Sequence, residues 1–323
     1  MTGSSTRLPR DVRERFRDLR ALEGMLITPE DRVWLEKPPA RPAPKPTVLY
    51  LGCNILRTPH LAQTIVALFE HIGEDFVALG GTAFCCGLPV QTTENRGQSW
   101  GERLTIQFGH FQPQQVVMWC PSCLYYHQEV LALATPYPVV HVTEFLAENK
   151  HRFSFSPLPP TRIALHYHCG SPAQDRQAAA VRSLLAAVPG IETREIGSLP
   201  TWGRNCAGNQ RDRMGREAWD SLITPFFDKA TALQADVFAT AYHGCLRMYG
   251  GYEKGQPFSV EHYLSVVARA LGITYPDKYK QYLHWKDEEA ILQDASANMK
   301  ASSVTASSAS PVVKRIFVDD CGF

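Results

Sequence analysis

The sequence predicts an α/β protein made of two related halves, each built around a parallel β-sheet. Three observations support this fold class: short apolar runs alternate with helix-period segments from residue 47 onward, the pattern occurs twice, and cysteines follow the apolar runs. Buried parallel strands are continuous apolar runs because helices cover both faces of the sheet. We expect two Rossmann-like domains at 47–153 and 161–286, with an N-terminal helical extension and a flexible C-terminal tail.

The N-terminal extension covers residues 1–46. Its segment DVRERFRDLRALEGML is rich in arginine and has a helical pattern, and the following EKPPARPAPKP favours an extended connector because proline prevents regular helix. The extension contains no cysteine. We expect it to be an appendage of the first domain.

The first domain alternates strands and helices. Its predicted strands are TVLYLGC, FVALGG, VVMWC and VVHV, and its predicted helices include LAQTIVALFEHIG, RLTIQFGHF, LYYHQEVLALA and TEFLAENK. In a parallel sheet of this kind, ligands bind at the carboxyl ends of the strands. Residues that directly follow the predicted strands are therefore the candidates for a site.

The second domain repeats the first. After the linker SFSPLPP, the segments that correspond are RIALHYHC with TVLYLGC, NCAG with CCGL, VFATAYHGC with VVMWCPSC, and SVEHYLSVVARALG with HVTEFLAENK. Corresponding residues are about 116 to 122 positions apart, which indicates a duplicated domain with small insertions. Residues 287–323 contain the low-complexity run ASANMKASSVTASSAS, which predicts a flexible tail.

Composition excludes several classes of partner and location. The 33 basic residues balance the 32 acidic ones, so nothing favours nucleic acid or an anionic membrane as a partner. No run of about 18 apolar residues predicts a transmembrane segment, and no apolar signal segment lies at the N-terminus, so we expect a cytoplasmic protein. Because thiols stay reduced there, the nine cysteines indicate metal binding rather than a disulfide framework.

Five cysteines lie in the first domain, in three groups: Cys53, Cys85-Cys86 and Cys120-x-x-Cys123. Each group follows a predicted strand, so the three loops should bring the five sulfurs to one edge of the sheet. Cys120 and Cys123 alone would suit a thioredoxin-type pair or half of a zinc site.

These two alternatives leave part of the pattern unexplained. A thioredoxin-type pair leaves three cysteines without a role, and zinc takes four ligands at one ion, for which adjacent cysteines with diverging side chains are a poor pair. An iron–sulfur cluster has several irons, so adjacent thiolates can each bind a different one. Five buried free cysteines at strand ends would be a coincidence. The pattern favours an iron–sulfur cluster.

The order Cys53, Cys85-Cys86-Gly87, Cys120-x-x-Cys123 resembles the CCG or cysteine-rich domain of the heterodisulfide reductase B subunit and its relatives. These relatives include iron–sulfur subunits of lactate-utilisation, glycolate and glycerol-3-phosphate dehydrogenases. The resemblance covers roughly residues 47–275. It implies that these five cysteines hold a non-cubane 4Fe-4S cluster, in which cysteines both terminate and bridge irons, and that the cluster reduces a disulfide substrate directly.

The second domain departs from that pattern because it retains three of the five thiols: Cys169, Cys206 and Cys245. They could hold a cubane cluster whose fourth iron is bound by His243, solvent or a partner, or a zinc ion with His243 or His168 as the fourth ligand. The site could also be empty.

Two histidines flank the first of these cysteines in the segment HYHC. His166 and His168 are two residues apart, so they share one face of the predicted strand. They could donate hydrogen bonds near the second site, although histidines in strands more often bond only the backbone.

The chain lacks an electron supply of its own, since it has neither a G-x-G-x-x-G fingerprint after a strand nor a ferredoxin cysteine run. The resemblance implies a ferredoxin-like iron–sulfur subunit and a flavoprotein subunit as partners, and a disulfide or sulfane-sulfur substrate, small or protein-bound. The hypothesis is an oxidoreductase subunit of a heterodisulfide reductase-like complex. The alternatives are an electron-transfer subunit of a lactate- or glycolate-type dehydrogenase, and a non-enzymatic scaffold.

Overall fold

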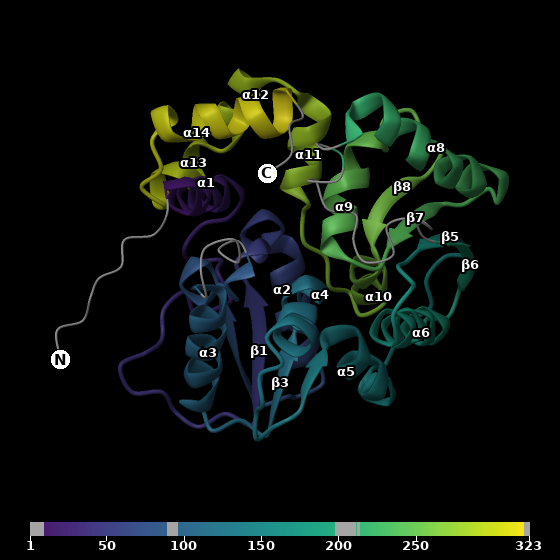
Figure 1. Ribbon diagram of the computed structural model, residues 1–323. Helices are drawn as coiled ribbons and strands as arrows, with labels where there is room; N and C mark the ends of the chain where they lie inside the picture. The colour runs from purple at the N-terminus through teal and green to yellow at the C-terminus, as the bar shows by residue number, and fades with distance from the viewer. Residues whose placement is uncertain (1–9, 89–95, 198–210, 212–213, 320–323) are drawn as a thin grey trace.

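The protein contains two four-stranded parallel sheets, one in each half (Figure 1). The computed structural model describes residues 10–88, 96–197, 211 and 214–319. The strands of the first sheet, in spatial order, are β2 (Phe76–Gly80), β1 (Thr47–Gly52), β3 (Gln115–Met118) and β4 (Val139–His141). Those of the second sheet are β6 (Ile191–Gly197), β5 (Thr161–His166), β7 (Val237–Thr240) and β8 (Ser259–His262). Each half therefore places its strands in the same order, and the predicted duplicated α/β fold is confirmed.

Helices flank both sheets (Figure 1). The first half contributes η1 (Asn54–Arg57), α2 (Pro59–His71), η2 (Thr82–Phe84), α3 (Arg96–Gly109), α4 (Pro121–Tyr125), η4 (Tyr126–Val130), α5 (Val142–Glu148) and η5 (Lys150–Arg152). The second half contributes α6 (Pro172–Ala186), α8 (Arg216–Ala232), α9 (His243–Tyr249), η6 (Gly250–Tyr252) and α10 (Tyr263–Arg269). In the described part of the chain, no helix is long and apolar enough to cross a membrane.

The backbone hydrogen bonds show which residues of the two halves correspond. Where β3 ends, Trp119 N–H donates to Tyr50 O at 2.9 Å; where β7 ends, Ala241 N–H donates to His166 O at 3.0 Å. Tyr50 therefore corresponds to His166, and Trp119 to Ala241. This match lets the two sheet edges be compared residue by residue.

A third unit joins the two ends of the chain. Helix α1 (Arg10–Leu26) lies beside α13 and α14, far from it in sequence (Figure 1). The C-terminal elements of this helical cap are α11 (Lys278–Trp285), α12 (Glu288–Asp294), α13 (Ser296–Ala301), α14 (Ala306–Val313) and η7 (Lys314–Val318). Asn298 Nδ2 donates to Met25 O at 3.0 Å, and Arg315 pairs with Asp18 at 2.9 Å. The cap has its own apolar core, formed by Leu22, Met25, Tyr282, Ile291, Val313, Phe317 and their neighbours.

In place of the flexible tail expected from low complexity, residues 288–318 form α12, α13, α14 and η7, and α13 and α14 pack on α1. The buried residues Ala309, Val312, Val313, Ile316 and Phe317 follow the i, i+3, i+4, i+7, i+8 spacing of an amphipathic helix. The alanines favour helix, and side chains cap the helix starts: Asp287 Oδ1 accepts from Ala290 N–H, and Thr305 Oγ1 accepts from Ser308 N–H. The spacing of these apolar residues predicts a helix, although the low-complexity composition of the segment does not.

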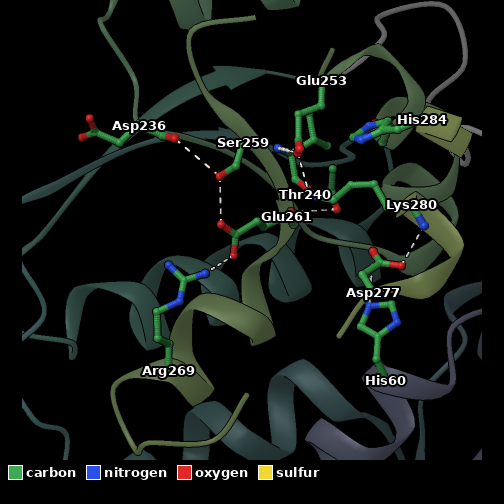
Figure 2. Close-up of polar contacts among 12 residues, drawn as sticks. His60, Asp236, Thr240, Glu253, Ser259, Glu261, Arg269, Asp277, Lys280 and His284 are labelled. Atoms are coloured by element: carbon green, nitrogen blue, oxygen red, sulfur yellow. Dashed lines mark hydrogen bonds and ion pairs between the residues drawn. The ribbon is translucent and has the colours of Figure 1, made fainter. Parts of the chain in front are cut away.

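The cap is attached to both halves through α11 (Figure 2). Lys280 Nζ donates to Glu253 at 2.6 Å and to Val260 O at 3.0 Å in the second half. On the other side, Asp277 lies 3.5 Å from Nε2 of His60, a residue of α2 in the first half. The N-terminal extension is therefore more than an appendage, since α1 and α11 belong to one unit that contacts both halves.

Candidate metal centre

The five cysteines of the first half lie together at the carboxyl edge of its sheet. Cys53 Sγ is 3.8 Å from Cys85 Sγ, and Cys86 Sγ is 3.3 Å from Cys123 Sγ. Cys120 is within hydrogen-bonding reach of Cys123. All five are free thiols and only 1% to 5% exposed. The structure thus brings together the whole set that the strand order was expected to assemble.

Three neighbouring strands deliver these residues. Cys53 follows β1, Cys85 and Cys86 follow β2 and η2, and Cys120 and Cys123 follow β3. Because β1 lies between β2 and β3, the three loops meet at one edge. The last two cysteines are the N-cap and third residues of α4, which begins with a proline and places them on one side of its first turn.

The sulfurs influence one another's protonation. Hydrogen bonds from Cys123 and Cys85 hold the pKa of Cys86 well below its usual range, against the effect of burial. Hydrogen bonds from Cys123 and His243 likewise lower the pKa of Cys120. The pKa of Cys123 itself is raised by its hydrogen bonds to Cys120 and Cys86. Cys86 and Cys120 are therefore the thiols that lose a proton most readily, and the resulting thiolate is the form that binds metal.

Two buried side chains hold the loops that carry the cysteines. Tyr50 Oη donates to Phe84 O at 2.8 Å and lies 3.9 Å from Cys123 Sγ. Burial lowers the pKa of His141 to about 4, so its ring is neutral at pH 7. Its Nδ1 accepts from a backbone N–H two residues on, which leaves Nε2–H to donate to Trp119 O at 3.0 Å. These bonds fix the loops after β2 and β3.

A buried arginine interacts electrostatically with the centre. Arg57, the last residue of η1, is 3% exposed. Burial holds the pKa of its guanidinium well below the usual range, Arg247 and Arg15 lower it further, and Tyr279 and Cys53 raise it. A thiolate at Cys53 would favour the charged form of this guanidinium, because opposite charges stabilise each other when buried.

His243 belongs to the second half but reaches the first centre. Its ring stacks on Trp119 with centroids 5.1 Å apart, and its side chain hydrogen-bonds Cys120. We expected this histidine at the second site, beside Cys245. The structure places it across the interface of the halves, because the first turn of α9 faces the loop after β3.

The second half brings together a different set of donors. Ligand atoms of His166, His168 and Cys245 all lie within 4.8 Å of one another, and His168 Nε2 is 3.1 Å from Cys245 Sγ. Of the other expected residues, Cys169 is exposed and Cys206 lies outside the described residues. Sequence reasoning considered His168 as a zinc ligand but His166 only as a hydrogen-bond donor.

The fold and the five buried thiols of the first half suit a metal-binding α/β domain of the cysteine-rich type. The family model of CCG, the cysteine-rich domain, matches residues 47–126. The match includes all five cysteines of the first half and ends before the second half. Residues 47–126 of the first half are therefore similar to the CCG cysteine-rich domain.

No match was found among curated proteins. Among solved structures, a glutamate racemase isoform from Bacillus anthracis is 14% identical over 72% of this chain and 80% of that chain, with a TM-score of 0.31. The Aquifex pyrophilus enzyme is 16% identical over 72% and 84%, with a TM-score of 0.32, and the Francisella tularensis enzyme 10% over 71% and 79%, also at 0.32. A likeness at this level says nothing about function.

Proposed function

We propose that the first half holds an iron–sulfur cluster on Cys53, Cys85, Cys86, Cys120 and Cys123, as in the heterodisulfide reductase B subunit. The observation that carries the proposal is the convergence of five buried thiols at one sheet edge. A single zinc ion takes four ligands, whereas a cluster of several irons accommodates five thiolates, two of them adjacent in sequence.

The charges around the site suit an anionic cluster. Arg57 interacts electrostatically with Cys53, and its guanidinium would compensate the negative charge of a thiolate there. The stacked rings of Trp119 and His243 are both buried and exclude water from the side of Cys120. When bound, the cluster would supply one-electron transfer.

The proposed reaction is electron transfer to or from a disulfide or sulfane-sulfur substrate within a heterodisulfide reductase-like complex. Two electrons are needed to cleave one disulfide bond, so a ferredoxin-like iron–sulfur subunit and a flavoprotein subunit would supply or remove them. The chain would be the subunit of this complex that carries the site for sulfur chemistry.

One observation favours a second candidate function. All five cysteines are at most 5% exposed, which suits a centre that passes electrons without touching substrate. The chain would then be the electron-transfer subunit of a lactate- or glycolate-type dehydrogenase. Co-purification from the native host separates the candidates: ferredoxin-like and flavoprotein subunits with dye-linked disulfide reduction support the first, and a 2-hydroxyacid oxidase supports the second.

The cluster itself is tested on the full chain purified without oxygen. We expect brown protein with about four irons and matching acid-labile sulfide per chain, and an electron paramagnetic resonance signal in one oxidation state. Cys86→Ala should lose this iron, because Cys86 contacts both Cys85 and Cys123. The matched control is Cys169→Ser, which removes an exposed thiol and should keep the wild-type spectrum. A Cys86→Ala protein with unchanged iron and spectrum would refute the ligand assignment.

A further inference from the structure

We infer that the second half holds a single zinc ion on His166, His168 and Cys245. The three ligand atoms lie within 4.8 Å of one another, and the three residues are 0% to 1% exposed. Tetrahedral zinc, at about 2.0–2.1 Å from nitrogen and about 2.3 Å from sulfur, requires ligand atoms about 3.5 Å apart. The 3.1 Å between His168 Nε2 and Cys245 Sγ is close to that separation.

The fold positions these donors as it positions the thiols of the first half. His166 is the last residue of β5, His168 follows it by two residues on the same side, and Cys245 lies in the first turn of α9 after β7. β5 and β7 are adjacent parallel strands, so their carboxyl ends meet. The site therefore occupies the same edge of the second sheet that the thiols occupy in the first.

The comparison of equivalent residues explains why this site suits one ion and not a cluster. Counting two residues from the matched pair Tyr50 and His166, Gly52 corresponds to His168. A Cβ at Gly52 would lie 3.6 Å from Cys123 Sγ, so the glycine leaves open the space beside that sulfur. In the second half an imidazole fills the equivalent space and contacts the sulfur of Cys245. The room that a polynuclear centre needs is taken by a ligand side chain.

The donor set selects the metal. Two imidazoles and one thiolate suit zinc, whereas magnesium and calcium prefer oxygen ligands. Tyr249 Oη lies 3.3 Å from His166 Nε2, and a hydrogen bond of this kind orients an imidazole ligand. Aromatic rings of Phe226, Phe238 and Tyr242 pack around the two histidines. A water molecule would complete the four ligands of the zinc ion.

A zinc ion here would also act on the first centre. Cys245 is two residues after His243 in the first turn of α9. Binding of Cys245 to zinc would hold that turn, and with it the His243 ring that stacks on Trp119 and contacts Cys120. The zinc ion of the second half would thus stabilise the contact between the two halves.

The test is zinc and iron analysis of the full chain expressed in zinc-supplemented medium. We expect about one zinc per chain in the wild type, and loss of at least nine tenths of it in Cys245→Ser and His168→Ala. Cys169→Ser is the control for adventitious binding, because it removes an exposed thiol next to the site and should keep the zinc. Zinc retained in Cys245→Ser, or lost equally from Cys169→Ser, overturns the assignment.

Cobalt substitution of the unmutated chain keeps the proposal testable if these variants do not fold. One thiolate and two imidazoles around cobalt should give a thiolate-to-metal charge-transfer band and strong tetrahedral visible bands, both removed by added zinc. Spectra of octahedral cobalt without the thiolate band would refute the site. Because Cys86→Ala should leave zinc content unchanged, failure of the iron proposal and failure of the zinc proposal are distinguishable.

Discussion

The two halves share a strand order but present different chemistry at the same sheet edge. In the first half, three loops contribute five thiols that contact one another. In the second half, the position of Tyr50 is taken by His166 and that of Gly52 by His168, and these imidazoles gather around one thiol. The comparison indicates that the strand order determines where donor side chains meet, while single residues beside the strands determine how much space is left between them.

The helical cap adds a second difference between the halves. Its N-terminal helix α1 packs on η1, the turn that follows Cys53, whereas its helix α11 packs on η6 of the second half. The loop of the first centre is therefore covered by a helix from the N-terminal extension. The metal site inferred in the second half is enclosed by side chains of its own half.

The largest expected effect comes from giving the first half the histidine of the second. Gly52 has φ +69°, which side chains rarely adopt, and a Cβ there would lie 3.3 Å from Tyr50 Oη. We expect Gly52→His to lose nearly all cluster iron, because the imidazole would occupy the space beside Cys123. Iron and sulfide analysis of anaerobically purified protein measures this.

The matched control is Gly73→His. Gly73 has φ +64°, so the backbone strain is similar, but a Cβ at this position would have no neighbouring atom within 4 Å and the site is untouched. This variant should lose about 1–2 kcal/mol of stability and keep its iron. If Gly52→His binds as much iron as Gly73→His, the explanation of the difference between the halves by available space is wrong.

A smaller effect concerns the cap helix that covers the first centre. Burial raises the pKa of Glu23 in α1 to about 7, despite its ion pair with Arg32 at 2.8 Å. Because the folded pKa lies above the unfolded one, the stabilisation is present below pH 4.5 and is lost as pH rises through 7. The free energy of unfolding should therefore fall over this range by at most about 3 kcal/mol more in the wild type than in Glu23→Gln.

Denaturant titrations at a series of pH values measure this dependence. Glu30→Gln removes an exposed carboxylate shortly after the end of the same helix and should give the wild-type profile. Parallel profiles for wild type and Glu23→Gln would contradict the buried-carboxylate account of how α1 packs.

The smallest effects separate the two tyrosines that accompany the sites. Tyr50→Phe removes the hydrogen bond to Phe84 O and should cost about 1 kcal/mol of unfolding free energy without changing iron content. Tyr249→Phe removes the contact with His166 and should weaken zinc binding by about tenfold at a similar cost in stability. Competition with a chromogenic chelator measures the zinc affinity, and an unchanged affinity in Tyr249→Phe would show that this hydroxyl does not orient a ligand.

The fold class and the five-thiol set were predictable from the sequence. Each cysteine group follows a run that is apolar enough to be a buried parallel strand. A parallel sheet brings the carboxyl ends of its strands to one edge, independently of the conformation of the loops. The duplication was also predictable from the sequence, since Cys169 lies 116 residues after Cys53 and Cys245 lies 122 residues after Cys123. These features depend on local patterns and on topology alone.

The tertiary structure decided the remaining features. Two contacts join segments that are far apart in sequence: His243 contacts Cys120, and α1 packs with the C-terminal helices. Such contacts depend on how folded elements pack against one another. The composition of the C-terminal segment predicted a flexible tail, yet burial of Val313 and Phe317 in one apolar core with α1 stabilises its helices. Local sequence sets which residues can form an element or bind a metal, but only packing determines which of them share a site, because that choice is made by contacts between distant surfaces.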